Sequence, residues 1–293
     1  MGVGMSEKLT FGEDHSEGAA KAWGWVTAQT WTGWNLDVIA VDSRNKSANR
    51  SVVLSASGYD SLRLSTSPTT SPSSTDHLRE LPAKCGFNEV RYLTASNDPR
   101  LVLSECPDST LLVVGARGKG LMKALHIGST TEWLMQCPNT PLLIARSPVR
   151  TERILMCIDG STHADAAVEL LTHFPWIDAT NISVLSVIEA DNDVRASAEA
   201  AALRLEATGA KVEMQIVSPD PESITTNTRA SILEMSEQLQ PDLIVMGTRG
   251  LTGLPRLRVG SVASAIAHHS GSSVLLVRDL HEDDQGGVSL EGP

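Results

Sequence analysis

Two stretches decide the fold: STLLVVGARGKGLMKALHIGST at residues 109–130 and PDLIVMGTRGLTGLPRLRVGSV at residues 241–262. In each, an apolar run ends in Gly-x-Arg-Gly, a basic loop follows, and Gly-Ser begins a segment with helical spacing. Gly115 and Gly247 are 132 residues apart, and the later Gly-Ser pairs keep the same distance. A repeat at a constant offset indicates a duplicated structural unit. We therefore predict two tandem copies of one fold.

A matched apolar run follows each stretch, PLLIARS at 141–147 and SSVLLVRD at 272–279. The repeat therefore predicts a boundary between the copies near residues 146–150. The predicted domains are a first domain over 1–148, a second over 151–279, and an acidic, frayed tail over 280–293.

The second half alternates short apolar runs with segments of helical spacing. Such alternation predicts a buried parallel sheet with helices on both faces. The fold class is therefore α/β, with two tandem open five-stranded parallel sheets of Rossmann-like type. The expected strands are 153–159, 181–190, 211–218, 242–247 and 272–278, and the expected helices are 163–173, 193–208, 229–240 and 261–269.

The first half follows the same order less clearly, with a weak strand at 8–14, a helix at 18–32 and a strand at 35–42. Ser, Thr and Pro then crowd residues 43–75, and the repeat arithmetic assigns fourteen extra residues to this part of the chain. This composition favours a surface loop, while a partner-binding or phosphorylated loop is the alternative.

The repeated motif Gly-x2-Gly-x9-Gly-Ser has the chemistry of an anion cradle. We expect its first two glycines to turn with positive φ and to approach a ligand closely. The last glycine precedes a helix whose free N–H groups and positive dipole end favour a phosphate. We expect Ser129 and Ser261 to cap these helices and to offer a hydroxyl. The alternative is a duplicated structural turn that binds nothing.

The charge, the apolar runs and the cysteines of the sequence argue against several classes of function. The chain has 24 basic and 35 acidic residues, which argues against a protein that coats nucleic acid or an anionic membrane. We find no apolar run long enough for a membrane span and no basic-then-apolar leader, so we expect a cytoplasmic protein. Four scattered cysteines without a CxxC pair predict reduced thiols and no metal site. The sequence does not match the Walker phosphate-binding motif, the dinucleotide-binding glycine motif or the Gly-x-Ser-x-Gly motif of hydrolases.

Together these residues resemble the universal stress protein family in its tandem form. The resemblance implies an adenine nucleotide α-hydrolase-like fold and identifies the double glycine motif as an ATP-binding signature. It implies that Asp14 and Asp159 lie near the ribose and adenine, and that Val41 and Val187 present backbone to the adenine. Gly12 matches a glycine found in many tandem members of the family. The corresponding residue of the second half, Cys157, departs from this pattern.

The resemblance implies a regulatory or stress-response protein that binds ATP, with or without Mg, and hydrolyses it slowly or not at all. It also implies that the halves pair as a pseudo-dimer through their last strands, and that any homodimer uses another surface. The alternatives are an enzyme that cleaves at the α-phosphate and a nucleotide-free interaction module. The sequence does not identify the protein partner, and we predict no catalytic residue. The candidate nucleotide-binding residues are Gly12, Asp14, Val41, Gly115, Ala116, Arg117, Gly118, Gly128, Ser129, Asp159, Val187, Gly247, Thr248, Arg249, Gly250, Gly260, Ser261 and Val262.

Overall fold

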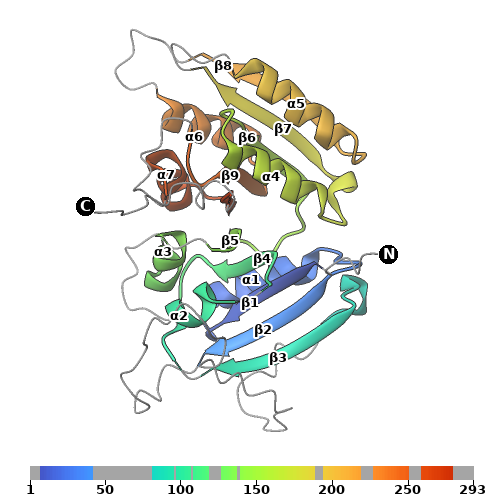
Figure 1. The fold of residues 1–293 in the computed structure, drawn as a ribbon, viewed down its shortest axis with the longest axis vertical. Helices are drawn as coiled ribbons and strands as arrows, with labels where there is room; N and C mark the ends of the chain where they lie inside the picture. Colours follow the sequence, from blue (N-terminus) through green and yellow to red (C-terminus); the bar gives the residue numbers. More distant parts are fainter. Residues whose placement is uncertain are drawn as a thin grey trace, which may run out of the picture. The chain divides into compact units, whose positions relative to one another are not determined.

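The computed structural model (Figure 1) describes residues 7–41, 81–95, 97–106, 108–118, 127–136, 139–188, 194–218, 227–250 and 259–279. The chain divides into two compact units. The first comprises Met1–Thr151 with Ala267–Val274, and the second comprises Glu152–Ile266 with Leu275–Pro293.

The described strands of the first half form a parallel sheet in the order β3-β2-β1-β4-β5. Their bounds are β1 (Lys8–Glu13), β2 (Asn35–Val41), β3 (Glu89–Ala95), β4 (Leu111–Gly115) and β5 (Leu142–Ala145). The weak strand expected at 8–14 is in fact central, since Leu9 pairs with Leu36 on one side and Leu111 on the other. Leu9 and Phe11 are both 0% exposed, so burial rather than local pattern stabilises this strand.

Helices lie on both faces of this sheet. They are α1 (Glu17–Ala28), α2 (Pro99–Ser104) and α3 (Ser129–Gln136), with a short 3-10 turn at Ala83–Cys85. Phe11 packs on Trp23 of α1 with ring centroids 5.3 Å apart. A Cβ on the next residue, Gly12, would lie 2.9 Å from Leu103 of α2. Because successive strand residues point to opposite faces, α1 and α2 lie on opposite sides of β1.

The second half repeats this order as β10-β9-β6-β7-β8, and α5 lies beside α4 over β7 and β8 (Figure 1). The predicted alternation of strand and helix is confirmed, and α7 has the predicted bounds. The strands are β6 (Arg153–Cys157), β7 (Asn181–Val187), β8 (Lys211–Val217), β9 (Leu243–Gly247) and β10 (Ser273–Val277). The helices are α4 (Thr162–Thr172), α5 (Arg195–Glu206), α6 (Thr228–Leu239) and α7 (Ser261–His269), with a 3-10 turn at Ile177–Ala179.

The helix α1 is shorter than predicted, because it ends at Ala28 rather than Thr32. Gln29 leaves the helix with an extended backbone, and its side chain is 1% exposed. The amide of Gln29 donates to the carbonyl of Val149 at 3.1 Å and accepts from the N–H of Thr151 at 3.2 Å. These tertiary bonds, which no local pattern predicts, end the helix early.

A tryptophan cluster follows α1. The ring centroid of Trp31 lies 5.8 Å from that of Trp25 and 5.2 Å from that of Trp34. All three are at most 2% exposed, so these rings are part of the hydrophobic core of the first unit.

Two of the predicted segments lie in parts of the chain that the structure does not describe. The Ser/Thr/Pro-rich segment 43–75 and the acidic tail 280–293 lie outside the described residues. Among the helices that the structure describes, none is long and apolar enough to cross a membrane.

Candidate functional site

In the first unit the end of β1 and the glycine loop after β4 lie against each other. A Cβ built on Gly118 would lie 2.7 Å from Oδ2 of Asp14. Ser16 joins the same two segments, because its N–H donates to Oδ1 of Asp14 at 3.0 Å and its hydroxyl donates to the carbonyl of Arg117 at 3.1 Å. The structure thus brings together Asp14 and Gly118, which the sequence placed in separate motifs.

The second unit repeats this arrangement. A Cβ on Gly250 would lie 2.6 Å from Oδ2 of Asp159. The N–H and the hydroxyl of Ser161 both donate to Oδ1 of Asp159, at 3.0 and 2.6 Å, and its hydroxyl lies 3.2 Å from the carbonyl of Arg249. One carboxylate oxygen is therefore held by the turn, while the other faces the glycine loop. This edge of a parallel sheet is where open α/β folds bind ligands.

The glycines of both loops do not have the positive φ that we predicted. Positive φ occurs instead at Gly33, Gly86, Gly160 and Gly209, and at His15 among other residues. The first glycine of each motif is required because another segment of the chain lies too close for a side chain. A Cβ on Gly115 would lie 2.3 Å from the backbone carbon of Gly18, and one on Gly247 would lie 2.8 Å from Cβ of His163. The first glycine of each motif therefore packs its strand end against the first turn of an earlier helix, α1 in the first half and α4 in the second.

The residue that caps each following helix lies one position earlier than we predicted. The N–H of Gly128 donates to the carbonyl of Ala116 at 2.8 Å, and the carbonyl of Gly128 accepts the N–H of Glu132 at 2.8 Å. Gly128 is thus the cap, and Ser129 is the first helical residue. Gly260 and Ser261 repeat this pattern through Thr248 and Ser264. The three following N–H groups have no acceptor within the helix.

Asp14 and Asp159 do not cap the helices that follow them. Ser16 caps α1 by accepting the N–H of Ala19 at 3.0 Å, and Ser161 caps α4 by accepting the N–H of Ala164 at 3.2 Å. The aspartates are therefore held in place by the caps rather than acting as caps. The sequence signal for the missed serines was present, since Asp-x-Ser occurs at the same place in both halves.

The remaining candidate residues lie near the ends of strands, on the glycine loops and on α7. Val41 and Val187 are the last residues of β2 and β7. Gly12 faces Leu103 and Val114, so its missing Cβ makes room for side chains of the core. Two candidates on the glycine loops are buried and one on α7 is half-buried, namely Ala116, Thr248 and Val262.

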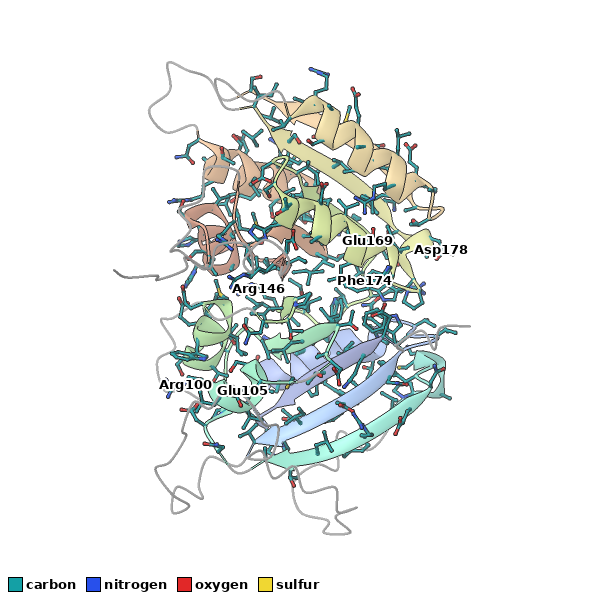
Figure 2. All side chains as sticks on the ribbon, in the orientation of Figure 1. Arg100, Glu105, Arg146, Glu169, Phe174 and Asp178 are labelled. Carbon is teal, nitrogen blue, oxygen red and sulfur yellow. The ribbon has the colours of Figure 1, made fainter. Side chains whose placement is uncertain are left out.

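Positive charge lies beside the first glycine loop. Arg146 follows β5 (Figure 2), and burial together with the charge of Arg117 lowers the pKa of Arg146. Two like charges this close to one loop favour an anion between or beside them. The basic residues predicted for the loops, Lys119, Arg256 and Arg258, lie outside the described residues.

The described residues contain no group of three or more His, Cys, Asp or Glu side chains that could hold a metal ion. Cys157, the counterpart of Gly12, is a buried free thiol whose pKa burial and the nearby Asp159 raise to about 12. It is therefore a protonated, poorly nucleophilic core residue at neutral pH.

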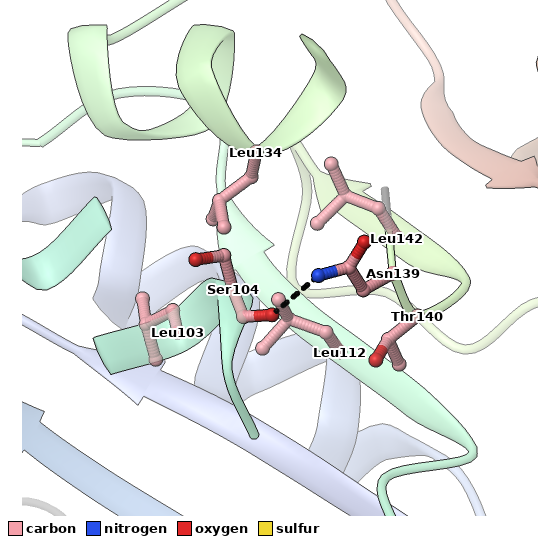
Figure 3. A pocket seen from close by; sticks show the side chains of 7 residues that line it. All are labelled: Leu103, Ser104, Leu112, Leu134, Asn139, Thr140 and Leu142. Carbon is pink, nitrogen blue, oxygen red and sulfur yellow. Dashed lines mark hydrogen bonds between the residues drawn. The ribbon is translucent and has the colours of Figure 1, made fainter. Parts of the chain in front are cut away.

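A small hollow in the first half lies away from this site (Figure 3). It is lined by Leu103, Ser104, Leu112, Leu134, Asn139, Thr140 and Leu142, and the amide of Asn139 donates to the carbonyl of Ser104 at 3.2 Å. Leu112 and Leu142 lie near the starts of β4 and β5, whereas the cradle lies at the strand ends. The hollow is therefore not part of the candidate site.

Comparison with known proteins agrees with this geometry. Residues 150–278 match the universal stress protein family. A universal stress protein of Mycolicibacterium smegmatis is 23% identical over 230 residues, which cover 69% of this chain and 75% of the relative. Another, of Methanocaldococcus jannaschii, is 47% identical over 47 residues, which cover 16% of this chain and 28% of the relative.

A solved structure extends the likeness to both halves. The universal stress protein of Archaeoglobus fulgidus aligns with a TM-score of 0.61 over 94% of this chain and 99% of its own, at 19% identity. At that identity the likeness shows the α/β fold. The family match covers the second half, and the first half shares its strand order and its cradle geometry with that half.

Proposed function

We propose that the chain is a tandem, ATP-binding regulatory protein of the universal stress type, with one adenine nucleotide site in each half. The observation that carries the proposal is the repeated meeting of a strand-end aspartate, a glycine loop and a helix start. The same three features meet in both halves, although the aspartates are 145 residues apart and the glycines 132 residues apart. The proposed domains are 1–148 and 151–279.

The residues present fit a nucleotide. The Cβ atoms missing from Gly118 and Gly250 leave space at Asp14 and Asp159. In this proposal the N–H groups at the starts of α3 and α7 hold phosphates, with help from Arg117 and Arg249. The aspartates accept hydrogen bonds from the ribose. The nucleotide supplies the energy of its binding, which biases the conformation or partner choice of the chain.

Hydrolysis is not the proposed role. The described residues around the cradles include no Walker-type lysine and no evident group to position a water, so turnover should be slow. An overnight assay that resolves AMP from ADP tests the alternative. Stoichiometric AMP would favour an enzyme that cleaves at the α-phosphate over a regulator.

The proposal is tested by Gly128→Glu and Gly260→Glu. Cβ atoms at these positions lie 3.1 Å from the backbone nitrogen of Gly118 and 3.3 Å from the carbonyl of Thr248. Each glutamate therefore enters its loop and adds like charge near the phosphates. Isothermal titration should give two ATP per wild-type chain, one in each single variant and none in the double variant.

The matched control is Gly271→Glu, because a Cβ at Gly271 meets nothing within 4 Å. This variant should still bind two ATP. Unchanged stoichiometry in the double variant, or no binding by the wild type, would overturn the nucleotide proposal in favour of the interaction module.

A further inference from the structure

The helix α7 belongs to both compact units. It is continuous from Ser261 to His269, and the glycine that caps it, Gly260, is part of the second cradle. Its residues up to Ile266 are in the second unit, whereas Ala267–Val274 are in the first. The helix therefore begins at one candidate site and ends in the unit that contains the other.

Two contacts within the first unit hold the end of α7. Nε2 of His268 lies 2.8 Å from Oε2 of Glu132, a distance at which an imidazole N–H donates to a carboxylate. The guanidinium of Arg146 donates to the carbonyl of Ala267. The last carbonyls of a helix have no partner within the helix, so a cation there satisfies one of them and suits the helix dipole. Glu132 and Arg146 therefore fix the last turn of α7.

Backbone hydrogen bonds join both of these residues to the first cradle. Glu132 lies in the first turn of α3, and its N–H donates to the carbonyl of Gly128, the cap of that helix, at 2.8 Å. The N–H of Gly128 in turn donates to the carbonyl of Ala116 at 2.8 Å. The N–H of Ala116 donates to the carbonyl of Ala145 at 3.1 Å, and Arg146 is the next residue. The start of α3, which the proposed function assigns to phosphates, is therefore connected to both contacts.

The guanidinium groups of Arg117 and Arg146 repel each other. Burial lowers the pKa of Arg146, and the charge of Arg117 lowers it further, so the charged form of Arg146 is held at a cost. Arg117 belongs to the glycine loop of the first cradle. An anion beside Arg117 offsets the repulsion and stabilises the charged form of Arg146, which is the form that bonds the end of α7 most strongly.

The duplication does not supply the ion-pair contact in reverse order. At the repeat offset of 132 residues, Glu132 corresponds to Ser264 on α7, and His268 corresponds to Gln136 at the end of α3. Neither counterpart has an ionisable side chain, so the same ion pair does not form between the start of α7 and the end of α3. The Glu132–His268 contact is therefore not a by-product of the repeat.

We propose that Glu132 and Arg146 are positioning residues that couple the two cradles, so that ATP in the first cradle strengthens ATP binding in the second. The inference rests on the proposed nucleotide function. A nucleotide in the first cradle fixes the start of α3 and offsets the like charges at Arg146, so the end of α7 is held more firmly. A second nucleotide at the start of α7 then meets a helix that is already ordered, which lowers the entropic cost of binding. By linkage, the second cradle strengthens the first by the same factor.

The test compares isothermal titrations of the full chain with ATP. Gly118→Leu and Gly250→Leu each block one cradle with an uncharged side chain, because Cβ atoms there would lie 2.7 and 2.6 Å from carboxylate oxygens of Asp14 and Asp159. Each clash is with the end of a side chain, which can move aside without unfolding the loop. If the cradles were independent, the wild-type titration would equal the sum of these two single-site titrations. We expect the wild type to bind its second ATP about fivefold more tightly than that sum predicts.

Arg146→Met removes the charge and the bond to α7 and keeps a long side chain. The same set of three titrations, repeated with this substitution, should become additive. A merely structural role of Arg146 would shift the single-site dissociation constants and leave the fivefold factor in place, so the comparison separates the two roles. Arg146→Lys keeps the charge and should keep a factor above about twofold. The matched control is Arg153→Met, which removes an arginine that is 55% exposed and should leave the factor unchanged.

Glu132→Ala tests the other contact and serves if Arg146→Met does not fold. Its side chain is 41% exposed, so its loss is tolerated more easily, and it should reduce the factor to below about twofold. Hydrogen exchange gives a second readout: ATP added to Gly250→Leu should slow the exchange of amides at the end of α7, although the cradle at the start of that helix is blocked.

Three results would each overturn this inference and leave the proposed function intact. The first is a wild-type titration that is additive, or one in which the second ATP binds more weakly than the sum predicts. The second is a fivefold factor that persists in both Arg146→Met and Glu132→Ala. The third is an equal loss of the factor in Arg153→Met. No ATP binding by the wild type would overturn both this inference and the proposed function.

Discussion

Each glycine of the repeated motif has its own packing requirement. Gly115 and Gly247 allow the strand ends to touch α1 and α4, Gly118 and Gly250 make room for an aspartate, and the last glycines cap a helix. The first of these roles is structural and would exist without a ligand. The motif therefore combines packing and binding in neighbouring positions, and substitutions can separate the two.

Gly115→Ala should be a stability variant. Its Cβ would lie 2.3 Å from the backbone carbon of Gly18, so the helix or the strand must shift, at a cost of about 1–3 kcal/mol. Urea unfolding should show a midpoint well below that of the wild type. Gly271→Ala, in open space, should stay within about 0.5 kcal/mol. Equal midpoints for both variants would contradict the packing role.

The sequence predicted which segments form the candidate site better than it predicted the contacts between them. The position of the glycine loop at a strand end followed from parallel-sheet topology, whereas the resemblance to a known family singled out Asp14. The expected positive φ was wrong, because the loop gains its shape from contacts with α1 rather than from left-handed residues.

At the scale of elements, α1 links the first cradle with the chain between the two halves. At its start, Ser16 bonds the carbonyl of Arg117. Near its end, Nε1 of Trp25 donates to the hydroxyl of Thr151 at 3.1 Å, and Gln29 bonds both Val149 and Thr151. The segment 148–151 is therefore held by α1 and is not a free linker.

Gln29→Ala should release this segment. The variant loses three hydrogen bonds at a residue that is 1% exposed, two of them to the segment 148–151 and one to the carbonyl of Trp25, which costs about 1–3 kcal/mol locally. Trypsin should then cut after Arg150 several-fold faster than in the wild type. Gln238→Ala on α6, which loses one exposed side-chain bond, serves as the control. Identical cleavage rates for both variants would show that α1 does not protect the segment.

Most elements could be predicted because apolar runs and helical spacing reflect burial that the sequence itself encodes. Thus α7 and the strands of the second half were found within a few residues of their bounds. The end of α1 was misplaced because Gln29, a good helix former, makes tertiary bonds instead. Local propensity could not anticipate bonds to residues 120 positions away.

At the scale of the molecule, the duplication preserved the scaffold and allowed the sites to diverge. Both halves keep one strand order and one Asp-x-Ser turn. The first unit also takes in Ala267–Val274. Within it, the N–H of Arg146 donates to the hydroxyl of Ser273 at 3.2 Å, and Nε2 of His268 lies 2.8 Å from Oε2 of Glu132. A copy of the second half on its own would lack these partners.

The fragment Thr151–Pro293 should therefore self-associate. It lacks Arg146 and Glu132, the partners of Ser273 and His268, and Ser273 and Val274 at the start of β10, both 0% exposed in the full chain, would lose part of their cover. An apolar strand edge left open is a pairing surface, and a second copy of the fragment offers a complementary one. Sedimentation velocity should show a dimer that forms with rising concentration, whereas Leu276→Pro, which removes a ladder donor from β10, should keep the fragment monomeric. A wild-type fragment that stays monomeric up to about 100 μM, a concentration at which a micromolar dimer would be nearly complete, would show that pairing through the last strand is wrong.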